Sequence, residues 1–194
     1  MQRFLRAKTS PYLLLAFLLC CSLSAFAQKV ERESRIKPDQ VPTQSLTYIE
    51  ATSLNKVNWY KETGLDSVSF EAKFKFSKRW FSVEFSEDGD LEDIEIEIAL
   101  DQLQPGVKGS IIKHLENEFT KFKVQKIQIQ YTETPLQVLL NHNIPKLDSP
   151  HAFEIVVKGK KSKVTLLWEL VFDSEGQFVS INQIVTRTST HLEY

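Results

Sequence analysis

The residue types that most often carry out chemistry are scattered along this sequence. Its four histidines, His114, His142, His151 and His191, are far apart, and no two of them are four residues from each other. A metal site needs several donor atoms close together, so this pattern predicts ordinary surface or core histidines. We therefore expect no metal and no other cofactor.

Acidic residues do occur in closely spaced groups. Asp88 and Asp90 flank a glycine, and Asp93, Glu95 and Glu97 follow at every second position. Such spacing could supply an acid pair or ligands for calcium. The same residues alternate with apolar ones, and alternation alone places them on the solvated side of a hairpin. We interpret them as a solvent-facing strand surface.

No sequence motif identifies an enzyme. The chain contains no G-x-S-x-G nucleophile elbow, no phosphate-binding P-loop and no dinucleotide-binding fingerprint. We expect a protein without catalytic activity. The alternative is a nucleophile and base that only the fold brings together, because catalytic triads are assembled by geometry and not by sequence spacing.

The first 27 residues have the pattern of an export signal. Basic residues come first, an apolar run begins at Tyr12, and the segment ends with Ala-Phe-Ala. A basic start, an apolar stretch of about 7 to 15 residues and an A-x-A exit are typical of a secretory signal peptide. We expect cleavage after Ala27 and a periplasmic or secreted protein. A retained anchor, or a lipid attached to Cys20 or Cys21, is the alternative.

Cleavage would change the composition of the chain. Both cysteines lie in the leader, so the mature part, 28–194, would form no disulfide and would have no thiol nucleophile. It also loses three basic residues and no acidic one, and the formal net charge falls from −1 to −4. This balance argues against nucleic acid as a partner. We expect no membrane span after cleavage.

The mature chain alternates between two hydrophobic periods. A polar lead-in at 28–40 precedes a region, 41–100, that begins with a weak helical pattern and continues as alternating strands. The region 101–187 begins with a stronger helical pattern and then alternates again. Within it, the proline-rich segment 132–150 is typical of an insertion, and 188–194 forms a tail.

The order of a helix followed by strands therefore occurs twice. An acidic turn ending in glycine closes a strand in each region, Ser-Glu-Asp-Gly at 86–89 and Asp-Ser-Glu-Gly at 173–176. We predict an α+β fold made of two tandem repeats. Each repeat is expected to have a helix packed on one face of an antiparallel β-sheet of about four strands.

These patterns resemble a known family. Residues 55–62 read Asn-Lys-Val-Asn-Trp-Tyr-Lys-Glu, and 80–91 read Trp-Phe-Ser-Val-Glu-Phe-Ser-Glu-Asp-Gly-Asp-Leu, with 168–178 repeating the second pattern. They are similar to the β-lactamase-inhibitor-like, PepSY-like proteins exported by Bacteroidetes-type bacteria. The resemblance covers nearly all of the mature chain. It implies a helix-backed antiparallel sheet in each half and a binding or inhibitory role outside the cytoplasm, with no inhibitor contact residue carried over.

The side of the sheet without helices is where a partner could bind. If Phe81 faces the helix, the neighbouring Trp80 points to the opposite side. Similar reasoning predicts an apolar and aromatic patch of Trp80, Tyr60, Leu167 and Val171 on that side, and aromatic residues are enriched at partner sites. The alternative is that this face is covered by the insertion, by the other half or by a second copy of the chain.

Two functions are consistent with such a surface. In the first, the exported protein binds an unknown protein or peptide partner of the cell envelope and inhibits or modulates it. In the second, it binds a small ligand or an envelope component in a cleft between the two halves. A large, flat apolar face would favour the first function, and a closed pocket with convergent polar groups would favour the second.

Overall fold

The structure is a computed structural model of the chain, which describes residues 28–29, 32–64, 67–141 and 150–184. The predicted leader, the predicted tail and residues 142–149 of the predicted insertion lie outside the described residues. No helix among the described residues is long and apolar enough to cross a membrane.

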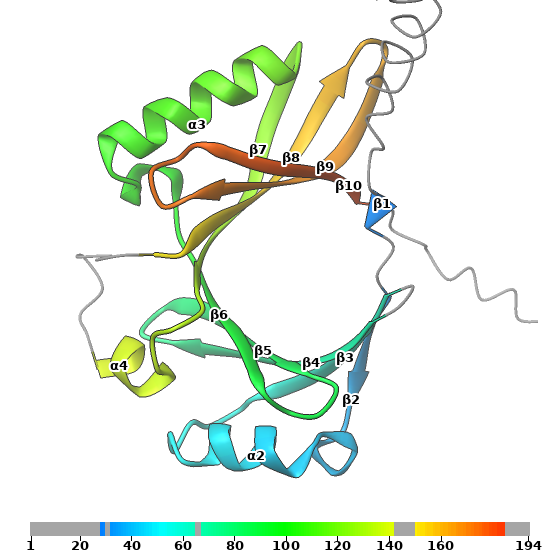
Figure 1. Cartoon of the computed structure of the whole chain (residues 1–194), viewed down its shortest axis with the longest axis vertical. Helices are drawn as coiled ribbons and strands as arrows, with labels where there is room; N and C mark the ends of the chain where they lie inside the picture. The colour runs from blue at the N-terminus through cyan, green and yellow to red at the C-terminus, as the bar shows by residue number, and fades with distance from the viewer. Residues whose placement is uncertain (1–27, 30–31, 65–66, 142–149, 185–194) are drawn as a thin grey trace, which may run out of the picture.

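Helices separate runs of consecutive strands along the chain (Figure 1). In chain order the elements are β1 Gln28–Lys29, β2 Arg32–Ile36, a 3₁₀ turn Pro38–Gln40, α2 Thr43–Glu50, β3 Asn58–Thr63, β4 Val68–Phe76, β5 Arg79–Ser86, β6 Leu91–Glu97, a 3₁₀ turn Leu100–Gln102, α3 Pro105–Glu118, β7 Lys121–Tyr131, α4 Leu136–Asn141, β8 Ala152–Lys161, β9 Val164–Asp173 and β10 Phe178–Ile184.

All of these strands belong to one continuous sheet. Its ten strands follow the order β1-β10-β9-β8-β7-β6-β5-β4-β3-β2. Strands β2 to β10 pair antiparallel, and the short β1 pairs parallel with β10. The sheet is strongly curved, and α2 and α3 lie on its outer, convex side (Figure 1).

This topology corrects the predicted architecture. The prediction of two tandem repeats with separate sheets of about four strands is wrong, because β6 pairs with β7 and joins all strands into one large sheet of an α+β protein. Pairing satisfies the backbone groups that two separate edges would leave open. The segment predicted as an insertion adds a further link, since α4 packs beside α2 and the Leu136 N–H donates to Tyr48 Oη at 3.2 Å.

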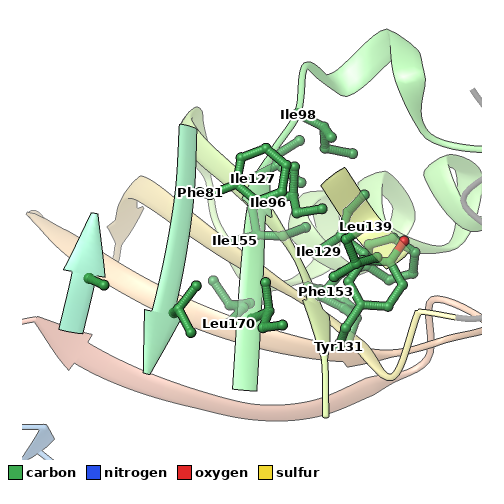
Figure 2. Close-up of a cluster of buried hydrophobic side chains, with 14 of the residues drawn as sticks. Phe81, Ile96, Ile98, Ile127, Ile129, Tyr131, Leu139, Phe153, Ile155 and Leu170 are labelled. Atoms are coloured by element: carbon green, nitrogen blue, oxygen red, sulfur yellow. The ribbon is translucent and has the colours of Figure 1, made fainter. Parts of the chain in front are cut away.

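The hydrophobic core lies between the sheet and the helices. The largest of the essentially inaccessible side chains among the described residues are Phe74, Phe81, Phe85, Ile94, Ile96, Ile111, Leu115, Ile129, Leu136, Ile155, Leu170 and Phe172. Figure 2 shows part of this core, where side chains of β5 to β9 meet Leu139 of α4. The predicted apolar faces of the strands are buried, and Trp59 and Trp168 also lie in the core.

The two acidic turns hold the helix starts in place. Gly89 has a φ of +94° and Gly176 a φ of +78°, the left-handed region that glycine enters without a steric penalty. A Cβ on Gly89 would lie 2.9 Å from Pro42 Cβ, and one on Gly176 would lie 2.9 Å from the Val107 carbonyl oxygen. Each turn therefore packs tightly against the beginning of a helix, α2 or α3.

Candidate functional site

The concave side of the sheet, the inner face, is mostly charged and polar. Strand register and alternation place these side chains on it: Glu33, Arg35, Asn58, Tyr60, Glu62, Ser69, Glu71, Lys73, Lys75, Trp80, Ser82, Glu84, Asp93, Glu95, Glu97, Lys126, Gln128, Gln130, Glu154, Val156, Leu167, Glu169 and Val171. The helices α2 and α3 cover the other side (Figure 1). The inner face is thus the side on which side chains are not committed to the core.

The structure brings two of the four predicted site residues together. Trp80 is 47% exposed and Tyr60 is partly buried, and both line a hollow of about 310 Å³. Leu167 and Val171 lie on β9, partly buried on the same face, and do not line this hollow. Strands β6, β7 and β8 separate them from Trp80, so the four residues do not form one continuous apolar patch.

The hollow is built by five neighbouring strands, β3 to β7. Its lining residues are Asn58, Tyr60, Lys73, Trp80, Phe81, Ser82, Glu97, Lys126 and Gln128. A second hollow of about 500 Å³ extends to residues 98–102 and shares Trp80, Glu97 and Lys126 with the first. A half-exposed aromatic side chain therefore borders two concavities at once.

Lysines lie over both aromatic rings. Lys73 Nζ is 4.9 Å from the centroid of the Tyr60 ring, and Lys75 Nζ is 5.8 Å from that of Trp80, distances typical of cation–π contacts. Lys73 also forms ion pairs with Glu71, at 2.7 Å, and with Glu33. Burial lowers the pKa of Lys73, but the two carboxylates outweigh it and the net shift is upward. Tyr60 is therefore held beside a permanent ammonium group.

Four carboxyl groups form what we call the acidic floor of the inner face. They are Glu71 on β4, Glu84 on β5, and Asp93 and Glu95 on β6. Glu84 lies opposite Glu71 in one strand pair and opposite Asp93 in the next. Like charges directly opposite each other destabilise a sheet, so this arrangement carries an electrostatic cost.

Neutral side chains supply several of the hydrogen bonds to the acidic floor. Ser69 Oγ donates to Glu84 Oε1 at 2.8 Å. Gln130 Nε2 donates to Asp93 Oδ2 at 2.7 Å, and Gln128 Nε2 donates to Glu95. These bonds solvate the carboxyl groups without neutralising them.

Burial and the repulsion of neighbouring carboxylates raise the pKa of two members of the acidic floor, Glu84 and Glu95. Burial raises the pKa of Glu84 to about 7, and Asp93 adds to the increase. Burial is also the largest cause of the raised pKa of Glu95, and the negative charges of Glu154 and Asp93 raise this pKa further. Near neutral pH the Glu84 carboxyl group is therefore about half protonated, which is unusual for a glutamate.

Five lysines form a second charged region, the lysine ladder, on β7 and β8. They are Lys121, Lys123, Lys126, Lys158 and Lys160. In register, Lys121 lies opposite Lys160 and Lys123 opposite Lys158. Gly159 faces the helix side, because a Cβ there would meet the ring of Phe119, and its neighbours in the strand therefore project from the inner side.

A group of three carboxylates is the best candidate for a metal site among the described residues. Oxygens of Glu33, Glu62 and Glu71 lie within 4.8 Å of one another. The ammonium of Lys73 is already paired with two of them, Glu33 and Glu71, so an internal cation takes part of the place that a metal ion would fill. The described histidines are not part of it: His114 stacks on Phe178, with ring centroids 4.2 Å apart, and His151 is exposed.

Sequence reasoning missed the acidic floor. Asp93 and Glu95 were predicted to face solvent, and this is wrong for Asp93, which is buried. Glu97 and the turn residues Asp88 and Asp90 are exposed, as predicted. The signal in the sequence was the series of acids at every second position, but it does not indicate how deeply the curved sheet buries them.

Comparison with known proteins identifies a fold. No family model matches the chain, and no curated protein matches it. Among solved structures, a DUF2874 family protein from Bacteroides ovatus has a TM-score of 0.50 and 17% identity, covering 75% of this chain and 89% of that one. A predicted periplasmic protein from Bacteroides eggerthii has a TM-score of 0.51 and 12% identity, with coverage of 77% and 94%.

A third structure, a BLIP-like protein from Bacteroides fragilis, has a TM-score of 0.48 and 17% identity, covering 77% of this chain and 92% of that one. The class that the fold defines is thus a curved, helix-backed antiparallel sheet found in Bacteroides proteins. The first two structures come from Bacteroides species, which agrees with the predicted resemblance to proteins of Bacteroidetes-type bacteria at the level of the fold. The β-lactamase-inhibitor-like relationship stays a prediction. The PepSY relationship and the signal peptide stay predictions.

Proposed function

We propose that this chain is an exported binding protein that docks a protein or peptide partner of the cell envelope on its inner face and inhibits or modulates it. The observation that carries the proposal is Trp80, which is 47% exposed and borders two hollows on the side away from α2 and α3. Export is supported by the leader pattern at 1–27 and by the likeness in fold to a predicted periplasmic protein. The proposed role is binding without catalysis.

The chemistry of the hollow suits a protein contact. Tryptophan and tyrosine are enriched among residues that dominate binding energy, and they are most effective when surrounded by polar groups that exclude water. Trp80 has Ser82 and Glu97 beside it, and Tyr60 is already oriented by Lys73. A ring that is held in place before binding loses little conformational freedom when the partner arrives.

A small ligand or envelope component is the second candidate. One observation favours it: the 310 Å³ hollow is lined from both regions of the chain, by Tyr60 and Glu97 from the first and by Lys126 and Gln128 from the second. This volume lies at the lower end of typical ligand pockets, about 300 to 1,000 Å³. A ligand of this kind would protect Trp80 from a fluorescence quencher in the absence of any protein partner.

The test uses mature protein, 28–194, as bait for a native envelope fraction. Trp80→Ala should lower the amount of the specifically captured partner at least tenfold, because burying a hot-spot aromatic contributes about 2 kcal/mol or more. Phe178→Ala is the matched control, since Phe178 is 41% exposed and contacts His114 on the helix side. Equal capture by wild type and Trp80→Ala would overturn the proposal. Size-exclusion chromatography of the same samples shows whether a second copy covers the face.

A further inference from the structure

The inner face is charged in opposite senses at its two ends. The acidic floor lies on β4, β5 and β6, and the lysine ladder lies on β7 and β8, with the hollow at Trp80 between them. We infer that the partner is a protein that docks in one orientation, with a basic side chain over the acidic floor and acidic side chains along the lysine ladder. The inference rests on the proposed function, because both regions belong to the same binding face.

The acidic floor is suited to a guanidinium or ammonium group. Its carboxyl groups receive hydrogen bonds from Ser69, Gln128 and Gln130, which bring no charge. Lys73, the lysine paired with Glu71, is shared with Glu33. A cation from outside would form charge-assisted hydrogen bonds, which are about twice as strong as neutral ones.

A second observation points independently to a hydrogen-bond donor. Gln128 is only 6% exposed and lines the hollow. Its Nε2 is used on Glu95, while its Oε1 has no hydrogen-bond partner within the described part of the chain. Buried acceptors are normally satisfied, so this oxygen is matched by a group that donates. Arginine and lysine side chains donate hydrogen bonds and do not accept them. Such a donor would satisfy both the Gln128 oxygen and the carboxyl groups beside it.

The lysine ladder is suited to acidic groups of a partner. Its register places two lysine pairs directly across from each other, Lys121 with Lys160 and Lys123 with Lys158. Among the residues that the structure describes, Lys121, Lys123, Lys158 and Lys160 form no ion pair, while the charge of Lys126 acts on Glu95 of the acidic floor. Facing like charges on adjacent strands costs stability, and carboxylates on a partner would remove that cost.

The size of the face favours a protein over a small ion. Gln130, which binds Asp93 at the acidic floor, and Lys121, at the end of the ladder, are nine residues apart on the same strand. At about 3.3 Å per residue the two ends are roughly 30 Å apart. A small cation or anion reaches one end only, whereas a standard protein interface of about 800 Å² per partner covers both.

Opposite charges in a fixed order give orientation. A partner that approaches in the reversed orientation would place its basic groups against the lysine ladder and its acidic groups against the acidic floor. Repulsion between these like charges disfavours that orientation. The acidic floor and the ladder therefore act as positioning regions on either side of the Trp80 hollow. They would fix the orientation of the partner, which the aromatic residues alone would not do.

Short peptides test each end separately. An arginine pentapeptide, Gly-Ser-Arg-Ser-Gly, should shift amide resonances of β5 and β6, and the same peptide with citrulline should not. A glutamate peptide should shift β7 and β8, and its glutamine counterpart should not. The double variant Glu84→Gln/Asp93→Asn should abolish only the first response, and Lys123→Gln/Lys158→Gln only the second.

The captured partner tests the order of charges. Each double variant should slow association about tenfold at low salt, and the effect should shrink as salt is added. The matched controls, Glu87→Gln/Glu116→Gln and Lys108→Gln/Lys113→Gln, remove two acidic or two basic side chains away from the inner face and should leave the rate unchanged.

The outcomes separate this inference from the proposed function. If Trp80→Ala abolishes capture while both charge variants associate at the wild-type rate, the proposed function stands and the proposed orientation is overturned. If Trp80→Ala captures as much partner as the wild type, the proposed function itself is overturned. Spermidine binding at least as tight as the arginine peptide, or head-to-tail self-association that the charge variants break, would also overturn the inference, because the occupant would not be a partner protein.

Discussion

The segments α2 with β3–β6 and α3 with β7–β10 build similar outer layers and opposite inner layers. On the outer side each has a helix whose start packs against a glycine turn, and each has a buried phenylalanine just before that turn, Phe85 or Phe172. On the inner side one carries the acidic floor and the other the lysine ladder. The difference shows which layer folding constrains: apolar side chains must fill the core, while the inner side chains are free to differ with function.

The largest expected effect is on the shared outer layer. Phe85→Ala and Phe172→Ala should each lower the free energy of unfolding by about 3 to 5 kcal/mol, because both rings are completely buried. Urea unfolding followed by circular dichroism measures this. Since one sheet joins both segments, each variant should still unfold in a single transition. Two separated transitions for Phe172→Ala would mean that the segments are independent, and the comparison would have to be made between two domains.

The glycine turns give the next largest effect. Gly89→Ala and Gly176→Ala should each destabilise the protein by about 1 to 3 kcal/mol, since positive φ and contacts of 2.9 Å leave no room for a Cβ. Gly109→Ala is the control, because Gly109 lies within α3 and a Cβ added there would have nothing within 4 Å. That change should stabilise the helix by about 0.5 to 1 kcal/mol. Equal destabilisation by all three substitutions would contradict the packing described for the turns.

The inner layers should differ in their response to pH. The pKa of Glu84 rises from 4.5 to about 7 on folding, so between these values the folded state holds a proton that the unfolded state has lost. Stability contributed by protonated Glu84 is therefore present below pH 4.5 and is lost as pH rises through about 7. The loss should amount to about 1 to 3 kcal/mol.

Glu84→Gln isolates this effect. The variant should keep a hydrogen bond to Ser69 with a neutral side chain. It should lose the part of the decline between pH 5 and 8 that Glu84 contributes, and it should be more stable than wild type at pH 8. Urea midpoints at the two pH values provide the measurement, with Glu116→Gln on α3 as the control that keeps the decline. An unchanged pH dependence in Glu84→Gln would mean that burial and Asp93 do not raise the pKa of Glu84 in the folded protein.

Much of the outer layer is predictable from the sequence, and the pairing of the strands is not. Alternation shows that Ile94 and Tyr131 each face a core, because burial in a strand has a period of two. It does not show that these two residues lie opposite each other and join β6 to β7. Pairing between distant strands depends on the whole fold, so two separate sheets and one continuous sheet give the same pattern.

The candidate site, like the fold, was predictable only in part from the sequence. Placing Trp80 and Tyr60 on the side away from the helices followed from alternation, and both line the hollow. The acidic floor depends on neighbours that are remote in the chain: Gln130, which binds Asp93, is 37 residues away. Strand register brings them together, and register between β6 and β7 cannot be read from either strand alone.

The smallest expected effect on stability is that of Trp80→Ala, and Trp168 on the opposite side of the sheet provides the contrast. Trp168 is 7% exposed and its Nε1–H donates to the Gly159 carbonyl at 3.2 Å, so Trp168→Ala should cost about 3 to 5 kcal/mol. Trp80→Ala should cost less than about 1 kcal/mol, because its half-exposed ring packs mainly against lysine and solvent. Thermal unfolding of both variants measures the contrast. A loss above about 2 kcal/mol for Trp80→Ala would make Trp80 a core residue, and the inner face would lose the aromatic anchor on which its proposed binding role depends.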